Sequence, residues 1–414
     1  MNFISTLPLD QFSRTPAGNF KPLPTPLAPI GSAIDALYVH VPFCTVKCHY
    51  CDFFSVAGHL DQADDFLQAL ARESELQIAH FGPIAPKMIF VGGGTPTLLA
   101  PQKLERLLQI IVGAASQSQL AEFTFEANPN TFDAARAAVL ARYGVNRISF
   151  GAQSFVPAEL AALQRDHLPA SVPAAVHAAR AAGIQNINLD LIFGIPGQTP
   201  ETWTYSLQQA LACNPSHMSC YSLMYEPNTP LTARLKAGQI TPMDDAAELQ
   251  LLHLTHQTLH NAGLQRYEIS NYAQPGRECR HNLLYWNGGN HLAWGPAAWA
   301  HVNGARWKNV ASLGRYIQAL NRDNCSVPIV EIDELTGLKR WGELAILQLR
   351  LTAGMNWAEL SRRSGVDVKG RLKSVLAKYD GMGLLEDVGE HLRLTDRAIS
   401  ISDTILADVL AALS

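Results

Sequence analysis

Residues 38–51 read YVHVPFCTVKCHYC, and this stretch decides how the rest of the chain is interpreted. It places three cysteines, Cys44, Cys48 and Cys51, at C-x3-C-x2-C spacing directly after a short apolar run. Three thiolates can hold three irons of a 4Fe-4S cluster and leave the fourth iron open for a small ligand. A structural zinc site is the alternative, but zinc normally takes four protein ligands. His49 could supply the fourth, so these residues favour the cluster without excluding zinc.

A second motif follows, where residues 88–97 read MIFVGGGTPT. An apolar strand that runs into three glycines lets a ligand approach the backbone without obstruction by side chains. Alone this pattern is weak, because tight turns also use glycine for steric reasons. Together with the three cysteines it resembles the radical S-adenosylmethionine (SAM) superfamily. The resemblance implies that the open iron chelates the methionine moiety of SAM and that Gly93, Gly94 and Thr95 contact its amino group.

The composition is that of a folded globular protein, with 414 residues of which 47% are hydrophobic. Such a chain can bury a large core in two or three domains. The net charge of −4 gives no general attraction to phosphates, so no nucleic-acid partner is expected. Seven cysteines, no signal-peptide pattern and no apolar run of about 18 residues predict a cytoplasmic chain with reduced thiols.

Short β-rich segments alternate with helical patterns from residue 36 onward. This alternation predicts a parallel sheet with right-handed crossovers, and six units predict an α/β fold built on a partial (β/α)6 barrel. Ligands gather at the carboxyl ends of the strands in such folds, where the cysteine and glycine motifs both lie. The six predicted strands are residues 36–41, 88–91, 122–126, 147–150, 186–192 and 218–223.

The chain divides into four predicted segments. The first, residues 1–33, contains six prolines and little hydrophobic periodicity, which indicates an irregular leader rather than a domain. The segments are the Pro-rich leader (1–33), the radical SAM core barrel (34–235), a connecting segment (236–330) and a C-terminal winged-helix-like α+β domain (331–414).

The winged-helix-like prediction depends on three helical stretches followed by a hairpin. DNA binding is not expected of this domain, because its third helix carries only four basic residues; a structural or docking role is favoured. The helical stretches and the hairpin are residues 341–351, 356–365, 369–380 and 383–395.

The first motif also matches Tyr-x-His-x-Pro-Phe-Cys, and it is most similar to the coproporphyrinogen dehydrogenase branch of the superfamily. That resemblance covers the chain from about residue 36 to its end and implies that polar residues at successive strand ends bind SAM. A carboxylate such as that of Glu126 can accept hydrogen bonds from both ribose hydroxyls, and the guanidinium of Arg165 can donate two parallel hydrogen bonds to a carboxylate. A single Glu or Arg is more often part of a surface ion pair, and core packing explains Tyr50 as well as stacking on adenine does. The predicted SAM-binding residues are Tyr38, Tyr50, Gly93, Gly94, Thr95, Glu126, Gln153, Arg165 and Asp190.

One departure separates this chain from the dehydrogenases of that branch. Their motif is C-x3-C-x2-C-x-C, with a fourth cysteine, whereas Asp52 and Phe53 follow Cys51 here. In this respect the chain resembles the HemW heme chaperones, and the oxidative decarboxylation that the dehydrogenases perform is in doubt.

A second feature points to the same group, because residues 281–286 read HNLLYW and match its H-N-x-x-Y-W motif. The imidazole of His281 could be an axial ligand of heme iron, and Tyr285 and Trp286 could cover the apolar macrocycle. A hydrogen-bonded histidine in an aromatic core is the alternative.

The resemblance therefore implies a heme chaperone that holds a 4Fe-4S cluster, SAM and heme, and delivers the heme to acceptor hemoproteins. Acceptors in this group include proteins of the respiratory membrane, so contact with the inner face of that membrane is compatible with a cytoplasmic chain, as is a homodimer. The alternative is an oxygen-independent coproporphyrinogen III dehydrogenase, which would decarboxylate two propionates to vinyl groups and would not bind heme tightly.

Overall fold

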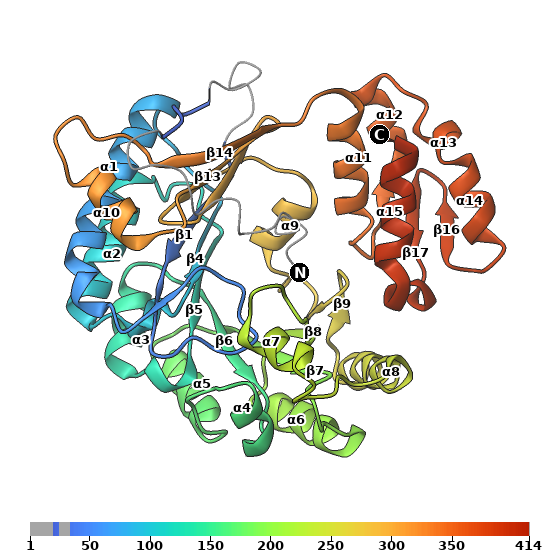
Figure 1. The fold of residues 1–414 in the computed structure, drawn as a ribbon, viewed down its shortest axis with the longest axis horizontal. Coiled ribbons are helices and arrows are strands. Elements are labelled where there is room, and N and C mark those ends of the chain that lie inside the picture. Colours follow the sequence, from blue (N-terminus) through green and yellow to red (C-terminus); the bar gives the residue numbers. More distant parts are fainter. Residues whose placement is uncertain (1–19, 25–33, 414) are drawn as a thin grey trace.

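The computed structural model describes residues 20–24 and 34–413, and Figure 1 shows their arrangement. Most of the predicted leader, residues 1–33, lies outside the described residues. In its short described part, the backbone N–H of Lys21 donates to the carbonyl of Ile329 at 2.8 Å, so this piece pairs with a strand at the edge of the sheet. No helix within the described ranges is long and apolar enough to cross a membrane.

Six parallel strands form the centre of the fold (Figure 1), which confirms the predicted α/β class. Neighbouring strands pair in chain order, and every one of these pairings is parallel. Their side chains are mostly buried and apolar, as expected for a parallel sheet that other elements cover. The strands are β1 (Ala36–Val41), β4 (Met88–Gly93), β5 (Glu122–Ala127), β6 (Arg147–Gln153), β7 (Asn186–Phe193) and β8 (His217–Ser222).

Amphipathic helices connect these strands and cover the outer side of the sheet (Figure 1). In α2 (Pro101–Ala114), Leu104, Leu107, Leu108 and Ile111 recur at helical spacing and are fully buried. The other connecting helices are α1 (Ala63–Phe81), α3 (Ala134–Arg142), α5 (Ser171–Ala181), α6 (Pro200–Ala212) and the short α4 (Pro157–Ala162). A further short helix, α7 (Pro230–Lys236), follows β8 and contacts the cysteine loop, where the backbone N–H of Leu231 donates to the carbonyl of His49. The sequence pattern predicts neither α4 nor α7.

The sheet continues beyond the six strands at both ends, an extension that the sequence pattern does not predict. Next to β1 lie one parallel and three antiparallel strands, and next to β8 lie two antiparallel strands that follow helix α8 (Asp245–Asn261). The strand order has two free ends, so the barrel is partial. The added strands are β9 (Gln265–Arg266), β10 (Asn271–Ala273), β11 (His291–Trp294), β12 (Trp299–Val302), β13 (Ala305–Asn309) and β14 (Ile329–Glu334).

A buried carboxylate joins helix α1 to this extension. Glu73 is fully buried and accepts hydrogen bonds from the backbone N–H of Gly295 at 2.7 Å and from the side chain of Asn309 at 2.6 Å. The hydroxyl of Tyr316, in α10 (Leu313–Leu320), also donates to it. Burial raises the pKa of Glu73 to about 7, although these donors act in the opposite direction.

The C-terminal part of the chain folds around its own apolar core and stands beside the barrel (Figure 1). Two helices and a hairpin occur in the predicted winged-helix-like order. They are α11 (Gly337–Gln348), α12 (Trp357–Ser364), β16 (Leu385–Val388) and β17 (His391–Leu394).

Three details of this part differ from the sequence expectation. The third predicted helix is divided at Leu372 into two short helices, and the side chain of Asp367 caps the start of the first by accepting the backbone N–H of Gly370. A two-residue strand pairs with β17 and makes the hairpin three-stranded, and a last helix packs against α11. These elements are α13 (Val368–Arg371), α14 (Lys373–Asp380), β15 (Met355–Asn356) and α15 (Ser402–Leu413).

Candidate functional site

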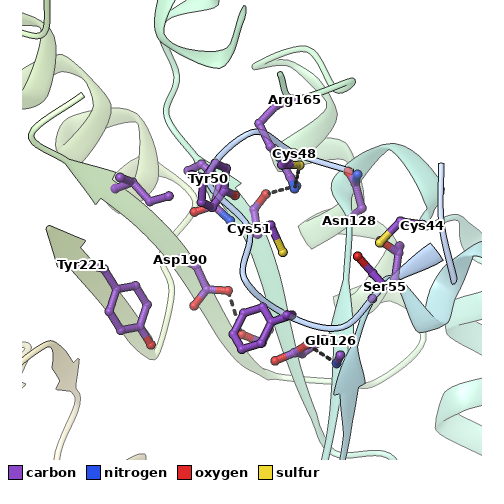
Figure 2. A pocket seen from close by; sticks show the side chains of 18 of the residues that line it. Cys44, Cys48, Tyr50, Cys51, Ser55, Glu126, Asn128, Arg165, Asp190 and Tyr221 are labelled. Atoms are coloured by element: carbon purple, nitrogen blue, oxygen red, sulfur yellow. Dashed lines mark hydrogen bonds between the residues drawn. The ribbon is translucent and has the colours of Figure 1, made fainter. Parts of the chain in front are cut away.

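A cavity at the carboxyl ends of the parallel strands brings the two sequence motifs together (Figure 2). Its volume is about 370 Å³, which is in the range of small-molecule sites. The predicted residues that line it are Cys44, Cys48, Tyr50, Cys51, Gly93, Gly94, Thr95, Glu126, Gln153, Arg165 and Asp190. The predicted residues that are not part of its lining are Tyr38, His281, Tyr285 and Trp286.

The three cysteines lie on a loop between two short strands, β2 (Phe43–Cys44) and β3 (Val56–Ala57), which pair in parallel. The backbone N–H of Cys51 donates to the carbonyl of Cys48 at 3.2 Å and closes a tight turn between them. Burial raises the pKa of Cys51 to about 12. A positive charge such as that of bound iron is therefore needed to hold this sulfur as a thiolate at neutral pH.

The arrangement of thiols fits an iron-sulfur cluster. Three cysteines line one cavity, and each iron of such a cluster takes one thiolate. Among the described residues, no three His, Cys, Asp or Glu side chains converge so as to hold a single metal ion. When bound, the cluster would supply an open iron for SAM and an electron for its sulfonium.

Tyr38 supports the cysteine loop from outside the cavity. Its hydroxyl lies 3.0 Å from Nδ1 of His40, whose Nε2 lies 2.7 Å from the carbonyl of Phe54. Burial lowers the pKa of His40 to about 4, so the ring is neutral. Its single N–H must then be on Nε2 and donate to Phe54, while Nδ1 accepts from Tyr38. A direct contact between Tyr38 and SAM stays a prediction.

The glycine loop is required for packing as well as for access. Gly93 has a φ of +107°, and its backbone N–H donates to the carboxylate of Glu126 at 3.1 Å. A Cβ on Gly92 would lie 2.6 Å from that carboxylate, and a Cβ on Gly94 would lie 2.6 Å from the carbonyl oxygen of Phe43. The Glu126 side chain could move away from a Cβ on Gly92, whereas the backbone of Phe43 could not, so only glycine at position 94 lets the end of β4 approach the cysteine loop this closely.

Arg165 reaches the cavity from the segment after α4 and lies over the end of β6. Its guanidinium donates to the carbonyl of Gly151 at 2.7 Å and to the sulfur of Cys48 at 3.6 Å. Its Nε–H is buried and has no partner within the described part of the chain. Gln153 lies next to it, at a bulge of β6, with a positive φ of 62° that few residues other than glycine adopt. The spare N–H of Arg165 fits a carboxylate ligand such as that of methionine.

Two partly buried carboxylates, Glu126 and Asp190, project into the cavity from β5 and β7 (Figure 2). Burial and the negative charge of Asp190 raise the pKa of Glu126 to about 7. Burial also raises the pKa of Asp190, although Ser149 donates to it at 3.1 Å and Asn188 at 2.7 Å. A positively charged ligand stabilises the ionised form of both groups, so the pair fits the cation SAM.

The structure adds polar residues that the sequence motifs do not identify. At the rim, the side chain of Asn128 donates to the carboxylate of Asp166 at 2.8 Å and holds the Arg165 segment near β5. Asn128 stands two residues after Glu126, so the strand-end rule that found Glu126 could also have found it. The others form the floor of the cavity, below Glu126 and Gln153 along the strands, and are Arg147, Ser149, Asn188, Ser219 and Asn282.

The segment with the H-N-x-x-Y-W motif forms helix α9 (Arg280–Trp286) at the amino-terminal side of the strands. The carboxylate of Glu122, the first residue of β5, accepts the first two backbone N–H groups of this helix at 3.0 and 3.2 Å. Leu284 packs against Ala36 and Met88, the first residues of β1 and β4. The helix therefore lies at the opposite end of the strands from the cysteine loop, and its other side contacts α11.

His281 is buried among aromatic rings in this helix. Its Nε2 lies 2.8 Å from the hydroxyl of Tyr285, and its ring centroid lies 5.1 Å from that of Phe90. Burial lowers its pKa well below the usual value, so the imidazole is neutral, which is the form that binds metals. The guanidinium carbon of Arg350 lies over Trp286, 4.9 Å from the centroid of the Trp286 ring. Heme ligation by His281 stays a prediction, because the described ring belongs to a hydrogen-bonded aromatic cluster.

Comparison with family models agrees with this geometry. The model of the radical SAM superfamily matches residues 38–210, and that of the HemN C-terminal domain matches residues 335–401. The first region contains β4 to β7, the greater part of β1 and most of the residues that line the cavity, and the second is most of the C-terminal part.

Curated relatives extend the similarity to most of the chain. The heme chaperone HemW of Bacillus subtilis is 34% identical over 379 residues, which cover 91% of this chain and 99% of the relative. The heme chaperone HemW of Mycobacterium tuberculosis (strain H37Rv) is 34% identical over 388 residues, with coverages of 93% and 97%. That of Escherichia coli (strain K12) is 40% identical over 269 residues, with coverages of 64% and 70%.

Among solved structures, coproporphyrinogen III oxidase (HemN) from Escherichia coli, a radical SAM enzyme, superposes with a TM-score of 0.80 at 22% identity. The superposition covers 91% of this chain and 90% of HemN. At that identity the likeness shows a common fold.

Proposed function

Because the chain belongs to the HemW family of heme chaperones within the radical SAM superfamily, we propose that it binds heme and transfers it to acceptor hemoproteins. In this proposal Cys44, Cys48 and Cys51 hold a 4Fe-4S cluster. SAM occupies the open iron, with its ribose at Glu126 and its carboxylate at Arg165. The described residues bind, orient and shield these groups.

The observation that carries the heme proposal is the ring cluster of helix α9. His281 is neutral and buried, and its Nδ1 has no partner within the described residues. Tyr285 lies at a centroid distance of 4.6 Å both from His281 and from His291. A neutral imidazole surrounded by aromatic rings provides an iron ligand and apolar contacts for a porphyrin.

The partners of this function follow from its cargo. Acceptor hemoproteins receive the heme, and those of the respiratory membrane would bring the chain to the inner face of that membrane without insertion. Homodimer formation belongs to the same proposal, whereas a nucleic-acid partner does not, given the net charge of −4.

An anaerobic hemin titration of the cluster-reconstituted protein, followed at the Soret band, tests the proposal. We expect saturable binding near one heme per chain. His281→Ala should weaken binding and shift the Soret band, because the axial ligand is lost. His177→Ala is the matched control, since His177 is exposed on α5, far along the chain from the motif. A wild-type chain without saturable binding would contradict the chaperone function, and an unchanged spectrum in His281→Ala would place the ligand elsewhere.

A second candidate is an oxygen-independent coproporphyrinogen III dehydrogenase, which the common fold with HemN favours. Phe53 stands at the position of the fourth cysteine of that branch and is 53% exposed. The enzyme predicts SAM-dependent conversion of coproporphyrinogen III to a divinyl product. Chromatography of the products from anaerobic incubation with a reductant separates the candidates, since the chaperone leaves the substrate unchanged.

A further inference from the structure

Arg147 places a buried positive charge on the floor of the cavity. It is the first residue of β6, is 2% exposed and lines the cavity. Its Nε has no hydrogen-bond partner, and its guanidinium forms no ion pair with a described residue. Charged groups are rarely buried this completely without a partner, so this position calls for an anion.

The carboxylates around Arg147 are engaged with other donors. Glu122 accepts the first N–H groups of α9, and Glu126 accepts the N–H of Gly93. Asp190 accepts hydrogen bonds from Ser149 of the neighbouring strand β6 and from Asn188 of its own strand β7. These acidic groups balance the charge of Arg147 at a distance, but none of them forms the paired contact that a buried guanidinium normally has.

The position is also distinct from the one that Arg165 provides for the carboxylate of SAM. Arg165 donates to the carbonyl of Gly151, which lies four residues after Arg147 in β6. Four residues of a strand span about 13 Å, so the backbone of Arg147 lies well away from the carbonyl that holds Arg165. The cavity lining therefore offers a second guanidinium, at the amino end of β6.

We propose that Arg147 and Asn282 form a carboxylate subsite on this floor, which takes one propionate arm of the tetrapyrrole cargo. The inference rests on the proposed heme binding. Asn282 lines the cavity from α9, and no hydrogen bond of its side-chain amide is made with a described residue. A guanidinium and an amide together supply N–H donors for both oxygens of a carboxylate.

The subsite connects the cavity with the ring cluster of helix α9. Asn282 directly follows His281, so a macrocycle held at His281 lies beside the floor. Only the two-methylene arm and its carboxylate then have to enter the cavity. Arg147 anchors the cargo through a charge, while the ring cluster of α9 contacts its apolar surface.

Hemin and hemin dimethyl ester provide the test, because they differ in the charge of the propionates and not in the iron or the ring. We expect the wild-type protein, with its cluster reconstituted, to bind hemin about tenfold more tightly than the ester, as one charge-assisted contact would give. Arg147→Gln should lose most of this preference, and Arg147→Lys should keep part of it because the charge remains.

Two controls separate anchoring from a structural role. The cluster absorbance and SAM affinity of each Arg147 variant show whether the cavity is intact, and the comparison of the two hemins in the wild type needs no variant. Equal binding of hemin and ester by the wild type, or an unchanged preference in Arg147→Gln, would overturn the subsite while the chaperone function stands. Absence of hemin binding by the wild type would overturn both.

Discussion

At the scale of the residue, distances of a few tenths of an ångström decide which side chains the site can contain. Gly94 illustrates this, because its Cα faces the backbone carbonyl of Phe43 at the start of the cysteine loop. No rotation of a side chain can relieve a clash with backbone, so a substitution there must move the loop that carries Cys44.

We expect Gly94→Ala to lose most of its capacity to hold the cluster and SAM, since its Cβ would lie 2.6 Å from a carbonyl oxygen. Anaerobic reconstitution followed by iron and sulfide analysis measures this. The matched control is Gly113→Ala, whose Cβ would meet nothing within 4 Å. Gly113 lies in helix α2, where alanine should stabilise the chain by about 0.5–1 kcal/mol. Equal iron content in the two variants would refute the packing argument.

A second residue-scale prediction concerns Glu126. Its pKa is raised to about 7, so below that pH the carboxyl is protonated in the free protein. SAM binding through the carboxylate must displace this proton, and we expect the affinity to fall by up to about tenfold per pH unit below about pH 7. Anaerobic calorimetry between about pH 6 and pH 8 measures the trend. Glu126→Gln should bind weakly and without this pH dependence; a pH-independent wild type would contradict the role of Glu126.

The residues of the site were predictable to the extent that they stand at the carboxyl ends of strands or within a motif. Glu126, Arg165 and Asp190 were found in this way and line the cavity. Arg147 was not, because a charged residue at the amino end of a strand ordinarily faces solvent. Its burial depends on α9, which packs there from more than a hundred residues later in the chain.

At the scale of the element, α9 is held by tertiary contacts rather than by its own propensity. It has seven residues, which is too short to be stable alone in water. Glu122 satisfies the N–H groups at its start, and Leu284 packs against the first residues of two strands.

We therefore expect Glu122→Gln to loosen α9, because an amide cannot accept from all the donors that the carboxylate now serves. The free energy of unfolding should fall by about 1–3 kcal/mol, and hydrogen exchange should accelerate in the peptide that contains residues 280–286. Glu105→Gln is the control, since Glu105 forms an exposed ion pair with Arg142 and should cost about 1 kcal/mol or less. Unchanged exchange in α9 would contradict this account of its anchoring.

Helices and strands with a clear apolar pattern in the sequence were predictable, whereas short elements that depend on tertiary contacts were not. All six central strands were found from their apolar runs, but β9 to β14 were missed because most of them are short and carry polar or charged residues among the apolar ones. The break at Leu372 was missed because residues 369–380 have apolar residues at helical spacing, and no glycine or proline stands at Leu372 to mark it.

At the scale of the whole molecule, Glu73 joins helix α1 to strands that come more than two hundred residues later. Its pKa of about 7 in the folded chain exceeds the value of about 4.3 in an unfolded chain. The folded state therefore binds more protons between these values, so this group lowers stability as the pH rises from about 4.3 to 7, with no further change above.

We expect Glu73→Gln to flatten that part of the pH profile and to destabilise the fold by about 1–3 kcal/mol, because one amide N–H would face another donor. Urea unfolding at about pH 5, 6, 7 and 8, compared between wild type and variant, measures both effects. The difference in the free energy of unfolding between wild type and variant should be largest near pH 5. There the wild-type carboxyl is protonated, so no buried negative charge destabilises the folded chain. A constant difference across the range would show that Glu73 does not titrate in this window.

The cysteine loop and helix α9 lie at opposite ends of the parallel strands, and this separation determines where other proteins can dock. Under the proposed function, an electron donor for the cluster would approach one end of the strands, and an acceptor of the cargo would approach the other. The two proteins would not compete for one docking surface, so the cluster could be reduced while the chain carries its cargo.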